Sequence, residues 1–327
     1  MSHKRFTALM QTMVLTFGTA VAIAQPVQSA IGTQSPSAIE ENLQISFLHF
    51  IFPNRRTRTR GSRRSSRAPF DESLPYVLSP RNSALIGTDA LTLQWHPVSG
   101  ATSYTVVING KGFNWEVEVT GPEATFDELK SLAPNYRYTM VITADNGISS
   151  ESGEPVGFTL LPETESARVN AQVDAIRAEQ GEPDEKALAI ALEYFEFEHS
   201  DPDWQSYALN QAAIDVLEAR IEAGTEDSRV YLLQADTYLK VGLPLLAQER
   251  YEEALTSAQA AGQAEWQAES YWGLADVAQG QTEYADALDH LQMAQALYEN
   301  LGNLEQATEL QTQIVALEMQ LPQSAFE

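Results

Sequence analysis

The 327-residue chain contains no cysteine. This absence excludes disulfide bonds, thiolate metal sites and a lipid-modified thiol. Histidine is scarce, and His49, His96 and His290 stand alone without the pattern of a catalytic triad. The chain also lacks a Gly-x-Ser-x-Gly nucleophile motif and a phosphate-binding glycine loop. The sequence therefore indicates no catalytic residue, no metal and no cofactor, and side-chain packing has to stabilise the fold.

Basic residues are missing from the C-terminal part of the chain. No Lys or Arg follows Arg250, whereas thirteen acidic residues do, and the formal net charge of the whole chain is −25. A surface this acidic repels phosphate groups, which argues against nucleic acid as a partner. The basic residues gather at the other end, because residues 1–68 hold nine basic and only two acidic residues.

The first residues have the layout of a secretory signal peptide. Lys4 and Arg5 precede an uncharged stretch from Phe6 to Ala24, and Ala22-Ile23-Ala24 offers a small-x-small cleavage site. We therefore predict a signal peptide over 1–24 and an exported, periplasmic or otherwise extracytoplasmic protein, soluble or peripherally attached. Retention of this stretch as a membrane anchor is the alternative, and no other segment has the roughly 20 apolar residues of a spanning helix.

Residues 25–68 are predicted to form a flexible tether, because they are rich in Ser, Gln, Pro, Thr and Arg and lack periodicity. An apolar segment, Leu43–Phe52, interrupts it, either as a short element that packs on a neighbouring domain or as an interfacial membrane anchor. Arginines follow this segment directly. Their predicted contact is an anionic membrane or cell-wall polymer, and they are Arg55, Arg56, Arg58, Arg60, Arg63, Arg64 and Arg67.

Residues 69–162 show the pattern of an antiparallel β-sandwich. Short stretches rich in β-branched and aromatic residues are separated by Gly, Pro and Asn-Gly turns. Strands are expected within 90–96, 103–109, 114–120, 136–144 and 155–161.

Two stretches of this region resemble a fibronectin type III domain. In LTLQWHPVSGATSYTVVI, Trp95 and Tyr104 fall on consecutive strands, and in LAPNYRYTMVITADNG, Leu132, Pro134 and Tyr138 match a tyrosine corner. The resemblance implies that Trp95 is a core residue and that Tyr138 is both a core and a corner residue. Since no Arg-Gly-Asp tripeptide is present, the integrin-binding activity of that family is not implied.

Residues 163–327 have a helical pattern dominated by Ala, Leu, Glu and Gln. Gly181, Gly224, Gly242 and Gly302 mark expected helix ends, and Pro183 marks the start of a helix.

An internal repeat is visible in this half. Residues 228–255 align with residues 268–295 at a shift of 40, and small residues recur where two helices of a hairpin approach closely. The repeat resembles the tetratricopeptide repeat. The matching positions are Ala235, Tyr238, Ala247, Tyr251 and Ala254 in the first copy, and Leu274, Ala275, Tyr284, Ala287 and Ala294 in the second. Gln234 departs from the pattern, since an apolar residue is expected there, and the period exceeds the usual 34.

Two further parts complete the expected solenoid. LAIALEYFEF and LNQAAIDVLEARI supply the helices of a degenerate repeat, and NLEQATELQTQIVALEMQL supplies a C-terminal capping helix. The predicted fold class is thus all-β plus all-α, with the sandwich followed by the helical repeats. This order of modules resembles exported bacterial repeat proteins.

Acidic residues and a histidine cluster between Glu196 and Asp203, in EFEHSDPD. A metal ion or an acid/base pair could use them, but capping and solvation of neighbouring helix ends is the interpretation that the spacing favours.

The predicted function is a non-enzymatic scaffold that binds a protein or peptide, possibly basic, on the concave face of the repeats. Envelope attachment through the arginines is the first alternative, and a carboxylate-dependent hydrolase is the second. Trp272 is either an aromatic anchor in the groove or a residue buried against the next hairpin. The predicted groove residues are Arg229, Leu232, Asp236, Leu239, Lys240, Glu269, Trp272, Asp276 and Gln279.

Overall fold

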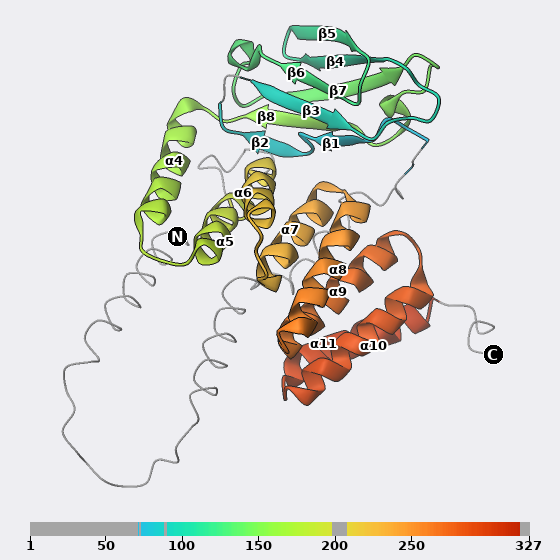
Figure 1. The fold of residues 1–327 in the computed structure, drawn as a ribbon. Coiled ribbons are helices and arrows are strands. Elements are labelled where there is room, and N and C mark those ends of the chain that lie inside the picture. The colour runs from blue at the N-terminus through green and yellow to red at the C-terminus, as the bar shows by residue number, and fades with distance from the viewer. Residues whose placement is uncertain (1–70, 72, 88–89, 198–207, 321–327) are drawn as a thin grey trace, which may run out of the picture. The chain divides into compact units, whose positions relative to one another are not determined.

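The computed structural model of the protein describes residues 71, 73–87, 90–197 and 208–320. The predicted signal peptide, the predicted tether and its seven arginines lie outside the described residues. Strands make up the N-terminal portion of the described part and helices the C-terminal portion (Figure 1). Within the described ranges, no helix combines the length and the hydropathy needed to cross a membrane.

The strands form two sheets. One has the order β1-β3-β6 and the other the order β2-β8-β7-β4-β5. All neighbouring strands are antiparallel except β2 and β8, which are parallel. Their bounds are β1 Val77–Ser79, β2 Ser83–Leu85, β3 Leu91–Trp95, β4 Tyr104–Gly110, β5 Phe113–Val119, β6 Glu123–Phe126, β7 Arg137–Ala144 and β8 Val156–Leu160.

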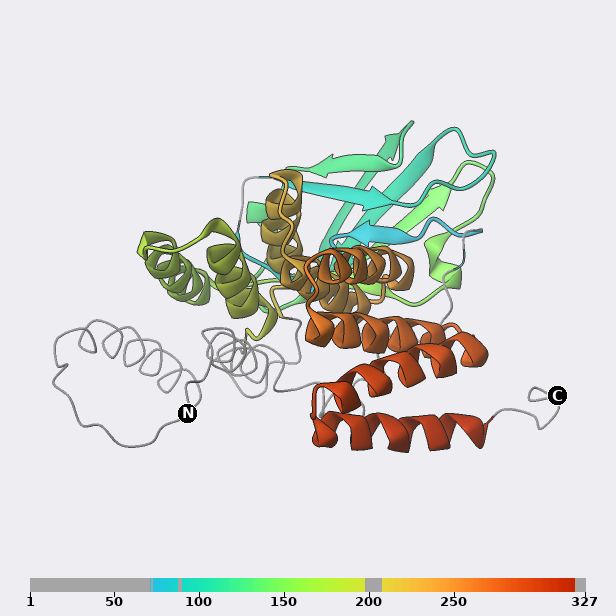
Figure 2. The ribbon, with the colours of Figure 1, turned by 60° about the horizontal axis from the view of Figure 1, so that its bottom comes forward.

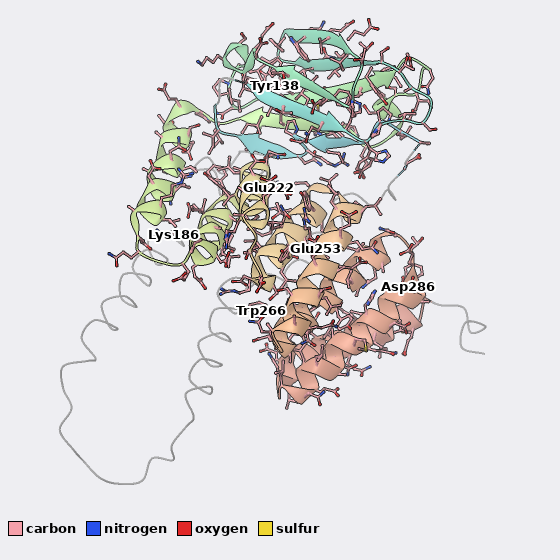
Figure 3. All side chains as sticks on the ribbon, viewed as in Figure 1. Tyr138, Lys186, Glu222, Glu253, Trp266 and Asp286 are labelled. Carbon is pink, nitrogen blue, oxygen red and sulfur yellow. The ribbon has the colours of Figure 1, made fainter. Side chains whose placement is uncertain are left out.

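The side chains that alternate along β4 and β7 bury one face of each strand, and residues from both sheets share one hydrophobic core. Trp95 lies in that core, 2% exposed, with its ring edge-to-face against Tyr104 at 5.4 Å. Tyr138 is also buried, and Figure 3 labels it in the β region. Its hydroxyl accepts a hydrogen bond from the Ala133 N–H at 2.8 Å and donates to the Ala133 carbonyl at 3.1 Å. The predicted burial of Trp95 and Tyr138 in a core is confirmed.

The five predicted strands are β3, β4, β5, β7 and β8. Three further strands, β1, β2 and β6, were not predicted, and they have three or four residues each. Such short segments complete too few alternations to give a period-two signal.

Eight helices follow the strands in the described residues. Their bounds are α4 Glu163–Ala178, α5 Pro183–Phe195, α6 Asn210–Glu222, α7 Ser228–Val241, α8 Pro244–Ala260, α9 Ala264–Gly280, α10 Tyr284–Asn300 and α11 Leu304–Glu318. The predicted turn signals fall between helices. Gly224, Gly242 and Gly302 all have positive φ, the left-handed conformation that ends helices.

The helices of the repeat pack as hairpins, α7 with α8 and α9 with α10, and α11 packs on α10. The small residues at the matched positions are fully buried, as predicted, and they are Ala235, Ala247, Ala254, Ala275, Ala287 and Ala294. α7 has 14 residues and α9 has 17, so the second copy begins about one helical turn earlier. Since α8 also has 17 residues, two long helices together lengthen the repeat beyond the usual period.

The strand region contacts the start of α6. Ala84 donates its N–H to the carbonyl of Ala208 at 2.9 Å. The side chain of Asn210 donates to the carbonyl of Asn82 at 2.8 Å, and the N–H of Gln211 donates to Ser83 Oγ at 2.8 Å. Ser83 and Asn210 are buried, so these hydrogen bonds satisfy polar groups that would otherwise be costly to bury.

Candidate partner-binding surface

The predicted groove residues lie on two helices, α7 and α9, that contact each other. We refer to these nine residues as the α7/α9 surface. Asp227 caps α7, because its side chain accepts a hydrogen bond from the N–H of Arg229 at 2.9 Å. Gly242 ends the helix with φ of 84°. The cap and the glycine therefore define both ends of the helix that supplies five of these residues.

The α7/α9 surface divides into buried and partly exposed residues. Leu232, Asp236, Glu269 and Trp272 are buried, at 0%, 1%, 7% and 3% exposure. The partly exposed members are Arg229, Leu239, Lys240, Asp276 and Gln279. The structure thus brings the predicted residues onto neighbouring helices but leaves fewer than expected open to solvent.

Trp272 is a core residue in this structure. It belongs to the hydrophobic cluster formed by α9, α10 and α11, and its ring lies edge-to-face against Tyr298 at 6.4 Å. Of the two interpretations of the sequence, the side chain is buried rather than an exposed anchor, but the ring contact comes from α10 of the same hairpin and not from a neighbouring hairpin. An exposed aromatic anchor is therefore not available at this position in the described conformation.

Two members of the α7/α9 surface are buried carboxylates, and each accepts a hydrogen bond from a tyrosine hydroxyl. Tyr251 of α8 donates to Asp236, and Tyr298 of α10 donates to Glu269. Hydrogen bonds to a charged acceptor offset part of the cost of removing the carboxylate from water. The second helix of each hairpin thus holds an acidic group of the first helix in place.

The two basic residues of the surface are engaged by other groups. Arg229 forms ion pairs with Asp227 at 2.5 Å and Glu185 at 2.6 Å. Burial alone would lower the pKa of Arg229, but the two carboxylates outweigh burial and raise that pKa above its usual value. Lys240 donates to the carbonyl of Phe195 at 2.6 Å and lies 3.9 Å from the centre of that residue's ring.

Gln234, which departs from the repeat pattern, has a polar partner on α6. Its side chain donates to Glu218 at 2.6 Å, and Arg250 approaches the same carboxylate at 3.2 Å. A charged residue on α6 therefore explains why a glutamine replaces the expected apolar residue.

Tyr238 lies on the same helix as Gln234, and burial raises the pKa of its hydroxyl to about 12.

Gly273, which was not among the predicted residues, sets the spacing between α8 and α9. A Cβ atom at this position would lie 2.2 Å from the ring of Tyr251. Since no carbon pair tolerates that distance, only glycine fits here. A glycine inside an otherwise helical pattern is the sequence signal that could have revealed this contact.

The predicted acidic cluster between Glu196 and Asp203 lies mostly outside the described residues, which end at Phe197 and resume at Ala208. In the described part of the chain, no group of three or more His, Cys, Asp or Glu side chains could hold a metal ion.

Comparison with known proteins supports the repeat assignment. Residues 226–300 match the family model of the tetratricopeptide repeat, so this segment carries such repeats. Among solved structures, one described as the crystal structure of MamA is 15% identical to this chain, with a TM-score of 0.30. The match covers 49% of this chain and 96% of the MamA chain. A second MamA structure is 16% identical, also with a TM-score of 0.30, and covers 47% and 87%. No curated protein matches this chain.

Proposed function

We propose that this protein is a non-enzymatic scaffold that binds a basic protein segment along α7 and α9. The tetratricopeptide repeats at 226–300 support a role in protein interaction. The charge of the α7/α9 surface supports the choice of partner. Its two cations are engaged by Asp227, Glu185 and the Phe195 carbonyl, whereas Asp236, Glu269 and Asp276 add acidic groups.

The observation that carries this proposal is the placement of the acids. Asp236 and Glu269 are held below the surface by tyrosine hydroxyls, and Asp276 is partly exposed. Asp276 lies on the same helix as Glu269, about two turns further along, and is the acidic member of the surface that a cation can reach from solvent. Gln279, three residues further along α9, and the partly exposed Leu239 of α7 offer a polar and an apolar contact.

Isothermal titration calorimetry with two matched peptides tests the proposal. A lysine-alanine-leucine repeat peptide should bind, and a glutamate-alanine-leucine peptide of the same length should not. Asp276→Asn should weaken binding about 2–5-fold, because a partly exposed ion pair contributes about 0.5–1 kcal/mol. Asp286→Asn serves as the control, since this exposed carboxylate lies on α10 (Figure 3). Equal effects of both replacements would contradict a site on α9.

We also propose that the strand region is a fibronectin type III-like sandwich that serves as a spacer or a second docking surface. Two sheets share one core, and the Tyr138 hydroxyl bonds back to Ala133. Both features fit the sandwich architecture with its tyrosine corner. Crystallography of the strand region would test this assignment through the strand order and the packing angle of the two sheets.

Export and attachment form a second proposal, which rests on the sequence alone. The signal-like segment over 1–24 supports an extracytoplasmic location, where the arginines between Arg55 and Arg67 could bind anionic membrane or wall polymer. The contrast between this cluster and the acidic remainder of the chain is the feature that favours it. N-terminal sequencing of exported protein should find Gln25 at or near the start.

A further inference from the structure

The last helix, α11, has two apolar faces. One face packs into the core of the array through Ala307, Leu310, Ile314 and Leu317, all at most 5% exposed. The other face carries large apolar residues that remain in water, namely Leu304 at 70% exposure, Val315 at 46% and Met319 at 83%. Figure 2 shows this helix at the red end of the colour scale, at one edge of the array, with described helices on one side of it.

The exposed face is a continuous stripe. Leu304, Thr308, Thr312, Val315 and Met319 follow one another at intervals of three or four residues, which places them on one side of a helix. Thr308 donates its hydroxyl to the carbonyl of Leu304 at 2.6 Å, and Thr312 donates to that of Thr308 at 3.0 Å. Both hydroxyls therefore already donate within the helix, and the stripe combines three large apolar residues with two threonines.

The stripe is also free of charge, in a protein with a formal charge of −25. Glu305 and Glu318 border it, and its own members are uncharged. Two copies of such an acidic protein repel each other over most surfaces. An uncharged apolar face is the kind of surface at which they could meet with little repulsion.

Four of the five residues of the stripe pair off about its midpoint, and the fifth, Thr312, lies next to that midpoint. Leu304 and Met319 are equally distant from the peptide bond between Gln311 and Thr312, and so are Thr308 and Val315. In an antiparallel helix pair with two-fold symmetry, Leu304 would meet Met319 of the partner subunit, and Thr308 would meet Val315 of the partner subunit. Self-complementarity of this kind is what an isologous interface requires.

We propose that α11 is a self-association surface, through which two copies of this chain form an antiparallel, two-fold helix pair. A stable dimer usually buries about 800 Å² on each partner, and one helical stripe supplies about half of that. The dimer is therefore weak and reversible. In this pairing Glu305 of one subunit lies opposite Glu318 of the partner subunit, and the two carboxylates repel each other. Added salt screens this repulsion and therefore strengthens the dimer. Salt should have the opposite effect on a basic peptide at the α7/α9 surface.

Sedimentation equilibrium of the full chain, over a wide concentration range, tests the association. The wild type should show a monomer–dimer equilibrium that shifts toward dimer with salt. Val315→Glu should weaken the dimer at least about 10-fold, because it places a charge in the apolar centre. Gln320→Glu adds the same charge to an exposed position outside the stripe and should leave the equilibrium unchanged. A wild type that stays monomeric at every concentration overturns the proposal.

Single cysteines test the register, because the chain has none of its own. Thr312 lies beside the two-fold axis, so Thr312→Cys should form a disulfide-linked dimer under mild oxidation. Leu304→Cys alone should not, whereas a mixture of Leu304→Cys and Met319→Cys chains should. Equal cross-linking by Gln320→Cys and Thr312→Cys would show random collision and overturn the antiparallel pairing. Unchanged helicity by circular dichroism would confirm that each variant is folded.

Discussion

The guanidinium of Arg81 donates through Nε to the carbonyl of Val241 at 2.9 Å, although the two residues are 160 positions apart in the chain. Val241 is the last residue of α7, where carbonyl groups lack helical partners and the helix dipole favours a cation. Arg81 also donates to the carbonyl of Val77 at 3.2 Å and is only 3% exposed. Tyr76 adds a hydrogen bond to the carbonyl of Gly242 at 2.6 Å. Residues on both sides of β1 thus donate hydrogen bonds to carbonyl groups at the end of a repeat helix.

Removal of the Arg81 side chain should therefore destabilise the helical array as well as the strand region. Arg81→Ala leaves buried carbonyls without their donor, and we expect a loss of about 2–4 kcal/mol in the free energy of unfolding. Urea denaturation monitored by circular dichroism measures it. Arg177→Ala is the control, because Arg177 and Asp174 form a pair whose side chains are 58% and 69% exposed. A loss equal to that of the control would mean that the Arg81 contacts contribute little.

Gly273→Ala should destabilise the array by about 2–4 kcal/mol, although alanine favours a helix by about 1 kcal/mol. The new methyl group would lie 2.2 Å from the ring of Tyr251 and would push α8 from α9. Gly280→Ala, in the same helix, is the control, since no atom lies within 4 Å of its added Cβ. Thermal unfolding compares the two. If both variants are equally stable, the close contact with Tyr251 is not a constraint.

The buried hydroxyl of Tyr238 predicts a loss of stability in alkali. Burial raises the pKa of Tyr238 from 10.0 to about 12, so the folded state favours the protonated phenol. This contribution is fully present below pH 10 and is lost as the pH rises through about 12. Tyr238→Phe should therefore show a smaller fall in stability over this range than the wild type. Some fall in stability should remain in this variant, because burial also raises the pKa of Tyr76 and of Tyr194. Identical pH profiles would contradict the prediction.

The attachment proposal makes a prediction about the arginine cluster. Replacement of the seven arginines between Arg55 and Arg67 by serine should reduce binding to anionic vesicles. Each basic residue near such a surface contributes about 1 kcal/mol, so the loss should exceed about 100-fold. Co-sedimentation with anionic and with zwitterionic vesicles, with and without added salt, measures it. Equal binding of both proteins to both kinds of vesicle would leave the cluster as a solubilising linker.

The helices were predictable because their ends carry local signals. Gly181 and Pro183 separate α4 from α5, and Gly242 ends α7, so the backbone conformations at these positions follow from residue type. The contact of Arg81 with Val241 could not be predicted in this way. An arginine between two short strands has the same local pattern whether its guanidinium lies in water or at the end of a distant helix.

The candidate surface was predictable only at the level of helices. The repeat pattern placed Trp272 and Asp276 on the same helix, but helical spacing does not tell how far the helices packed on α9 cover each of them. Trp272 is buried because Tyr298, from the second helix of the same hairpin, packs against its ring. Trp272→Ala is therefore expected to destabilise the array, in addition to any effect on a partner.

Hydrogen exchange tests the binding surface most directly. Amide exchange would be measured by mass spectrometry on the full chain, with and without the lysine-alanine-leucine peptide at a saturating concentration. The account predicts slower exchange in the peptide-bound protein over α7 and α9, at the ends that carry Leu239 and Gln279, and no change in α11. Protection confined to other helices, or the same protection with the glutamate-alanine-leucine peptide, would contradict a basic partner on the α7/α9 surface.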